Sequence, residues 1–172
     1  MTGTTEQMER EQQLQAWIDE YRTALLKICV MYLSDVPQAE DAVQETFLKA
    51  WKAMDKFEGR NGSSEKTWLI SIAINTCRSY RRTRWFRHID TTKSLENLPS
   101  RLASIPPEER DLFIDITRLP EKFKSVILLY YYQNMTQQEI ADTLGISRSL
   151  VAHRLGKALD MLKISLREEE RA

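Results

Sequence analysis

The chain has 172 residues, with 25 basic and 25 acidic side chains and a formal net charge of zero. This length allows one ordinary core or two small ones, and the zero net charge excludes any inference about partners from bulk charge. Five glycines and five prolines among many helix-forming residues favour an all-α fold. The first thirteen residues are polar and no apolar run approaches the roughly 20 residues that span a bilayer. We therefore expect a cytoplasmic protein without membrane insertion.

The two cysteines, Cys29 and Cys77, fall in apolar helical patterns. The sequence has no C-x-x-C pair, no Cys/His cluster and no P-loop, and neither histidine lies near a nucleophile. We expect both cysteines to be small core residues, with a redox or metal role as the alternative. The sequence thus predicts no metal, no cofactor and no enzymatic activity.

Three helices are expected in the N-terminal half, after a disordered N-terminus at residues 1–13. Apolar residues recur at helical spacing from Leu14 to Tyr32 and predict the first helix. Pro37 suits the first turn of the second helix. A serine of the loop EGRNGSS is expected to cap a third helix that begins near Glu65. The face of the second helix opposite its apolar stripe carries Asp41, Gln44, Glu45, Leu48 and Lys52.

The third helix leads into the stretch NTCRSYRRTRWFRH, residues 75–88. Its five arginines are interleaved with Tyr80, Trp85 and Phe86, and the nearest acids are Glu65 and Asp90. Three interpretations are open: a solvated face, a patch for anionic membranes, or a nucleic-acid site. Unpaired bases stack on aromatic rings while arginines bind phosphates, so the aromatics favour single-stranded nucleic acid.

Residues 91–107 lack helical periodicity and are rich in serine, threonine and proline, which predicts a flexible linker. Helices are then expected at roughly 107–118, 121–132, 137–144 and 148–166. The predicted architecture is all-α, with two small helical domains at 14–90 and 108–172.

Residues 135–162, MTQQEIADTLGISRSLVAHRLGKALDML, have the pattern of a helix-turn-helix. Thr136 and Glu139 suit a capping box, Gly145 suits the turn, and Ser147 suits the cap of the second helix. The outward side of that helix carries Ser149, Ala152, His153, Gly156, Lys157 and Asp160, with Arg154 on the flank. A face of small and polar side chains fits the major groove of DNA, and a helical hairpin that binds nothing is the alternative.

Three segments of the chain are informative when taken together: DVPQAEDAVQETFLKAWKAMDKFEG, TWLISIAINTCRSYRR and LPEKFKSVILLYYYQNMTQQEIADTLGIS. In order and spacing they resemble the bacterial sigma-70 family of RNA polymerase sigma factors. The short chain resembles the extracytoplasmic-function (ECF, group 4) subfamily. The resemblance implies a sigma-2 domain at 14–90 and a sigma-4 domain at 108–172. It implies a subunit that binds RNA polymerase core, recognises the minus-10 and minus-35 promoter elements and helps to melt DNA.

The resemblance also implies partners and residue roles. The implied partners are the beta-prime clamp coiled coil and beta flap of RNA polymerase core, promoter DNA and an anti-sigma factor. Core polymerase is expected at Asp41, Gln44, Glu45 and Leu48. The minus-10 single strand is expected at Asn75, Arg78, Ser79, Arg81, Arg82 and Trp85. The minus-35 duplex is expected at Ser149, Ala152, His153, Arg154, Gly156 and Lys157.

Some positions leave alternatives open. The alternative for Asn75 is that its side chain caps a helix or forms a hydrogen bond within the fold instead of contacting DNA. Leu150 and Ala152 depart from the threonine and the basic residue that are common in the family, which leaves the minus-35 preference open.

Two other functions for the whole chain remain as alternatives. A helix-turn-helix transcription regulator that is not a polymerase subunit would bind duplex DNA tightly as the free protein. A helical adaptor or anti-sigma partner would leave the arginines at 78–87 without a role.

Overall fold

The computed structural model describes residues 2–57, 64–81 and 107–171, and side chains within them except those at 81, 107–110 and 164–171. Every regular element in these ranges is helical, which confirms the all-α prediction. The chain divides into two compact units, Met1–Leu102 (unit 1) and Ala103–Ala172 (unit 2). The predicted linker lies, apart from Pro107, outside the described residues. Among the described helices, none has the length and apolar character needed to cross a membrane.

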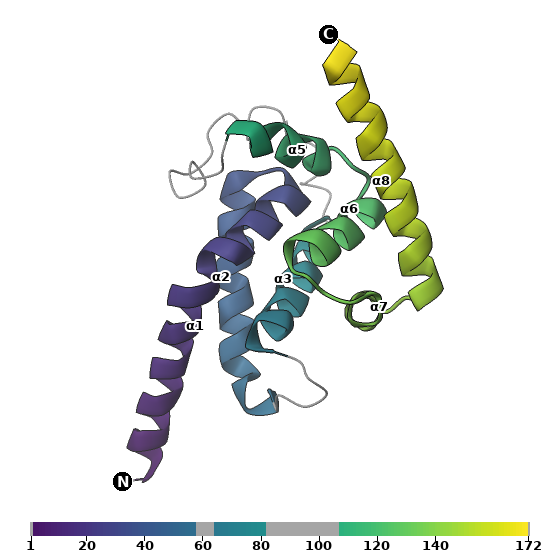
Figure 1. Ribbon diagram of the computed structural model, residues 1–172. Coiled ribbons are helices and arrows are strands. Elements are labelled where there is room, and N and C mark those ends of the chain that lie inside the picture. Colours follow the sequence, from purple (N-terminus) through teal and green to yellow (C-terminus); the bar gives the residue numbers. More distant parts are fainter. Residues whose placement is uncertain (1, 58–63, 82–106, 172) are drawn as a thin grey trace. The chain divides into compact units, whose positions relative to one another are not determined.

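Helix α1 runs from Thr2 to Leu33 (Figure 1), which corrects the prediction of a disordered N-terminus at residues 1–13. The early residues include many good helix formers, and Gln7 Nε2 donates to Glu11 Oε1 one turn later at 3.2 Å. Arg10 adds a long-range attachment. Its Nη1 lies 3.2 Å from Asp55 Oδ2, its Nη2 donates to the Trp51 carbonyl, and its guanidinium lies 5.1 Å from the Trp51 ring centre.

Helix α2 spans Val36–Lys52 and is followed by the short 3₁₀ turn η1, Met54–Lys56. Asp35 caps its N-terminus, since Asp35 Oδ1 accepts from Gln38 N at 2.9 Å. Pro37 lies in the first turn, where its missing N–H leaves no helical hydrogen bond unmade. The predicted helix start is confirmed.

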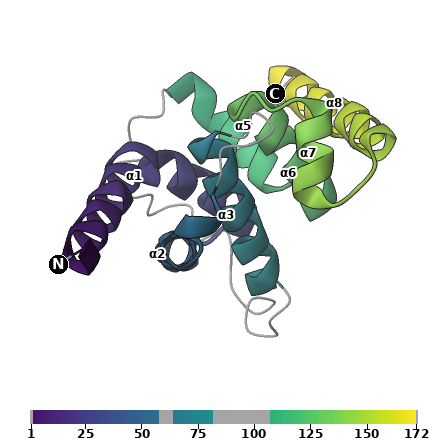
Figure 2. The same ribbon diagram turned by 90° about the horizontal axis from the view of Figure 1, so that it is seen from below.

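Helix α3 spans Glu65–Arg81 and begins at the predicted serine cap, where Ser64 Oγ accepts from Thr67 N at 3.1 Å. The three helices of unit 1 pack against one another pairwise (Figures 1 and 2). Their shared core is fully buried and includes Leu25, Ile28, Cys29, Tyr32, Ala42, Ala50, Leu69, Ile74 and Cys77. Both cysteines are free and lie in this core, as predicted.

Unit 2 consists of helices α5 (Pro107–Thr117), α6 (Glu121–Ile127), α7 (Gln137–Leu144) and α8 (Arg148–Arg171). A π-helical turn, η5 at Leu128–Tyr132, continues α6, so the predicted helix at 121–132 is α-helical over its first seven residues. Asn134, two residues after the turn, has a φ of +53° in the left-handed region, and Met135 N donates to the Leu129 carbonyl at 3.1 Å. The expected helices in this half are confirmed in order.

The predicted helix-turn-helix is formed by α7 and α8. Thr136 Oγ1 accepts from Glu139 N at 3.1 Å and Glu139 Oε2 accepts from Thr136 N at 3.1 Å, which completes the capping box. Gly145 adopts φ +68° at the turn, a conformation that costs little only without a Cβ. Ser147 Oγ accepts from Leu150 N at 3.2 Å at the start of α8. Both α6 and α7 pack on α8.

Candidate nucleic-acid and protein interfaces

The outward face of α8 presents the residues expected to contact duplex DNA. Exposed side chains on this face are Ser149, Ala152, His153 and Lys157, with Gly156 exposed and Arg154 half-buried on the flank. The opposite face packs into unit 2 through Val151, Leu155 and Ala158. Apart from the adjacent residues and the backbone of α8 itself, no atom lies within 4 Å of the position that a Cβ would take at Gly156, so packing does not require glycine there. This face can therefore enter a groove without disturbing the core.

The exposed flank of α3 brings together part of the candidate single-strand site. Asn75 and Ser79 are exposed and Arg78 is half-buried. Their spacing of three and four residues puts them on one side of the helix, where an amide, a guanidinium and a hydroxyl can bind the same nucleotide. Arg81 ends the helix, with its side chain outside the described set. Arg82 and Trp85 lie outside the described residues.

The outer face of α2 carries the residues expected to contact polymerase. Asp41 and Gln44 are exposed, and Leu48 is 52% exposed although it is a large apolar side chain. Glu45 is half-buried because it also serves the fold, with its Oε1 3.2 Å from Lys49 Nζ. An exposed leucine beside acids can contact a partner that offers both apolar and cationic side chains.

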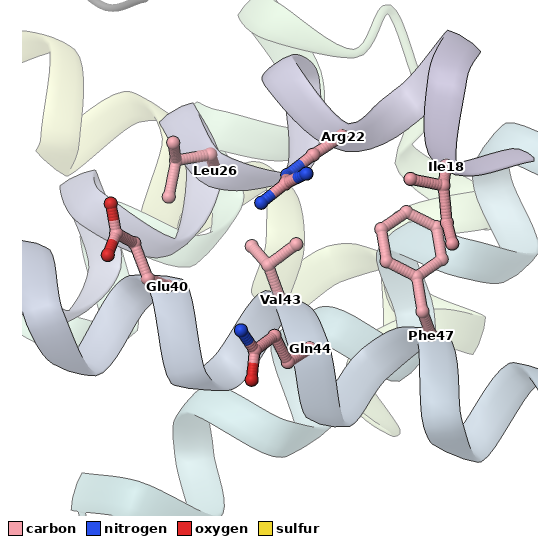
Figure 3. Close-up of a pocket in the computed structure, with 7 residues that line it drawn as sticks. All are labelled: Ile18, Arg22, Leu26, Glu40, Val43, Gln44 and Phe47. Atoms are coloured by element: carbon pink, nitrogen blue, oxygen red, sulfur yellow. The ribbon is translucent and has the colours of Figure 1, made fainter. Parts of the chain in front are cut away.

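Two hollows follow the seam between α1 and α2, next to this face. The first, of about 320 Å³, is shown in Figure 3 with its lining residues Ile18, Arg22, Leu26, Glu40, Val43, Gln44 and Phe47. In the figure, the Arg22 guanidinium extends from α1 toward Val43, and Phe47 lies beside Ile18. The second, of about 460 Å³, is lined in part by Phe47, Leu48 and Trp51. Since Phe47 lines both, the hollows form one interrupted groove along α1 and α2.

Sequence reasoning missed an apolar hollow in unit 2. It measures about 290 Å³ and is lined by Leu112, Ile116, Ile127, Tyr131, Tyr132, Leu159, Leu162 and Lys163. These residues come from α5, α6, η5 and α8, so no single helical pattern could reveal the hollow. The available signal was the run Tyr130–Tyr132, in which Tyr131 is 51% exposed.

Electrostatics link α3 to the acidic face of α2. Burial raises the pKa of the Tyr80 phenol far above its ordinary value, and the hydrogen bond to the Glu45 carboxylate and its charge raise it further. Tyr80 therefore stays neutral and can donate its proton to Glu45. Burial and the nearby Glu20 and Glu65 also raise the pKa of Tyr21. The described side chains contain no cluster of three or more metal-ligating groups.

Comparison with known proteins identifies the family. The chain matches Sigma-70 region 2 at residues 17–87 and Sigma-70, region 4 at residues 116–163. It is 30% identical over 161 residues to the ECF RNA polymerase sigma factor SigL of Mycobacterium tuberculosis, over 90% of this chain and 89% of SigL. The chain belongs to the ECF sigma factors of the sigma-70 family. Membership of this family disfavours the alternative that the protein is a helix-turn-helix regulator separate from the polymerase.

Other relatives of this sigma factor agree. It is 27% identical over 165 residues to the ECF RNA polymerase sigma factor SigW of Bacillus subtilis, over 88% of this chain and 87% of SigW. The fold resembles that of the sigma factor RpoE, solved in complex with the anti-sigma factor NepR from Bartonella quintana. That comparison gives a TM-score of 0.68 and 24% identity, over 91% of this chain and 96% of RpoE. The described α2 and α3 lie in region 2, and α6 to α8 lie largely in region 4.

Proposed function

We propose that this sigma factor binds RNA polymerase core, recognises the minus-10 and minus-35 promoter elements and promotes DNA melting at initiation. The observation that carries the proposal is the pairing of two exposed helix faces in one chain. The flank of α3 at Asn75, Arg78 and Ser79 lies in region 2, and the outward face of α8 lies in region 4. The polymerase supplies the chemistry, and this chain supplies binding and strand opening without being an enzyme.

The sigma-2 domain at 14–90 is proposed to capture the minus-10 element as single strand. A flipped base costs a few kcal/mol of lost stacking, so the protein has to offer hydrogen bonds and stacking surfaces in return. Asn75 and Ser79 are exposed and can bond a base edge, while Arg78 offers a planar guanidinium. In the same proposal Arg81 and Arg82 bind phosphates and Trp85 stacks.

The sigma-4 domain at 108–172 is proposed to read the minus-35 element as duplex. His153, Arg154 and Lys157 supply hydrogen-bond donors at the groove surface. Ala152 is exposed and has only a methyl group, which suits contact with the C5-methyl of thymine. Ser149, in the first turn of α8, suits a phosphate because the helix N-terminus is positive.

Core polymerase is proposed to bind both units. The acidic face of α2, with Asp41, Glu45 and the exposed Leu48, suits the beta-prime clamp coiled coil, which would lie along the groove between α1 and α2. The apolar hollow of unit 2 suits an apolar helix such as that of the beta flap. An anti-sigma factor that covers these surfaces would keep the protein inactive in the cytoplasm. The complex of RpoE with NepR supports a partner of this kind.

In vitro transcription tests the proposal. Core polymerase alone and core polymerase with this protein are compared on fragmented genomic DNA, and the transcript starts are mapped. New starts that share two upstream elements support the proposal, and identical transcripts refute it. Duplex binding by the free protein separates the alternatives, because a separate regulator binds its operator tightly without polymerase, whereas this sigma factor needs core.

A further inference from the structure

Lys49 bridges α2 and α3. Its ammonium lies 3.2 Å from Glu45 Oε1 on its own helix and donates to Thr76 Oγ1 on α3 at 3.1 Å. The Glu45–Lys49–Thr76 bridge fits the helix geometry, because Glu45 lies one turn before Lys49 on α2 and Thr76 lies on the side of α3 that faces α2. The bridge is therefore a directional link between the helix proposed to meet polymerase and the helix proposed to meet DNA.

Thr76 lies at the base of the candidate single-strand site. Its side chain is fully buried, and its hydroxyl donates to the Ile72 carbonyl at 2.8 Å while accepting from Lys49. Asn75 precedes it directly and Ser79 follows it by less than one turn. Because a helix moves as a rigid element over such a distance, the position of Thr76 sets the positions of both exposed residues.

The Lys49–Thr76 bond adds a directional contact to the apolar contacts of α3. Ala73, Ile74 and Cys77 bury the helix, but packing of this kind tolerates small rotations, whereas a hydrogen bond has a narrow range of lengths and angles. Tyr80 adds a second link, since its hydroxyl bonds to Glu45. Glu45 of α2 thus bonds both to Lys49 on its own helix and to Tyr80 on α3. A base-reading site needs its side chains held to within about 0.5 Å.

We infer that Lys49 is a positioning residue for minus-10 recognition, acting through its bond to Thr76 on the placement of Asn75 and Ser79. The inference rests on the proposed function, because it requires α3 to read the single strand. It predicts that Lys49 controls discrimination between bases and makes no contact with DNA itself.

The test uses the full chain assembled with core polymerase at saturating sigma factor. Dissociation constants are measured for a non-template-strand oligonucleotide that carries the mapped minus-10 element, and for the same oligonucleotide with single base changes. Lys49→Met keeps the aliphatic stem and removes the ammonium, and Thr76→Val keeps the shape and removes the hydroxyl. Lys49→Arg tests rescue, because arginine also donates to a hydroxyl. Lys56→Met, at an exposed lysine of η1, is the control for loss of charge.

Loss of one hydrogen bond is expected to lower the discrimination ratio about three- to tenfold in Lys49→Met and in Thr76→Val. The double variant should lose no more than either single variant, because both remove the same bond. Lys49→Arg should retain discrimination, and Lys56→Met should leave it unchanged. The slope of log affinity against log salt should be the same in all variants.

Other outcomes overturn the inference. A salt slope that falls by about one in Lys49→Met, with discrimination kept, means that Lys49 contacts a phosphate. A lower melting temperature with discrimination kept means that the bridge serves stability alone. Fully additive losses in the double variant mean that the two residues act separately. Absence of discrimination in the unsubstituted holoenzyme instead refutes the proposed function of α3, which distinguishes the two failures.

Discussion

Replacement of Thr136 by alanine removes one half of the capping box at the start of α7. Thr136 Oγ1 accepts from Glu139 N at 3.1 Å, and loss of such an N-cap bond costs about 1 kcal/mol, within a range of about 0.5 to 2 kcal/mol. Helix α7 has eight residues, too few to be stable by itself, so it depends on this cap and on the burial of Ile140, Ala141 and Leu144. We expect Thr136→Ala to destabilise unit 2 by about 1 kcal/mol.

Tryptophan fluorescence can separate the two units in this experiment. All four tryptophans, Trp17, Trp51, Trp68 and Trp85, belong to unit 1. Unfolding in urea followed by tryptophan fluorescence therefore reports on unit 1, while far-ultraviolet circular dichroism reports on both units. With a urea dependence of about 1 kcal/mol per molar, Thr136→Ala should lower the unit 2 midpoint by about 1 M and leave the fluorescence midpoint unchanged. Thr136→Ser keeps the hydroxyl and should resemble the unsubstituted protein.

Two results would refute this reasoning. A fluorescence midpoint that moves together with the circular dichroism midpoint would show that the units unfold as one cooperative body. A circular dichroism curve unchanged by Thr136→Ala would show that the capping box adds nothing to the stability of the helix-turn-helix.

Three further predictions concern single side chains. Gly145→Ala should lower the stability of unit 2 by about 1–2 kcal/mol in the same urea experiment, because alanine is strained at a φ of +68°. No atom crowds a Cβ at this position, so the loss comes from the backbone conformation, and Gly145→Asn should cost less. Equal losses in the two variants would contradict the backbone explanation. Tyr80 loses its proton near pH 10 in the unfolded chain but retains it in the folded protein, so the unfolding free energy should fall as pH rises above about 10. The fall should be less steep in Tyr80→Phe. Parallel curves for the two proteins would count against the raised pKa of Tyr80. Leu48→Asp should weaken binding to core polymerase at least about tenfold in a competition assay, because it removes exposed apolar contact area; an unchanged affinity would exclude Leu48 from the interface.

Short-range chemistry made much of the fold predictable from the sequence. The caps at Ser64, Thr136 and Ser147 each join atoms that are three residues apart, so the residue types alone indicate the hydrogen bond. The turn at Gly145 needs one residue with a positive φ, and its place between two apolar helical patterns reveals it. The exposed face of α8 followed from helical periodicity in the same way.

Features that depend on distant residues were not predictable. The helix at residues 2–13 is attached through Arg10 to Asp55, 45 residues later, and no local pattern contains that pair. The bond from Lys49 to Thr76 spans 27 residues. Likewise, the apolar hollow of unit 2 exists because α5 and α8 bring Leu112 and Leu159 to the same place. Each needs the packed structure before its partners can be named.

The outward face of α8 contributes little to the stability of the fold. Ala152, His153, Gly156 and Lys157 are exposed, and the core contacts of the helix come from the opposite side. Substitutions at these four positions are therefore expected to leave unit 2 nearly as stable as before, whatever they do to the proposed contact with DNA. If this face reads promoter DNA as proposed, duplicated copies of such a gene can diverge toward new promoters one mutation at a time while each intermediate protein stays folded.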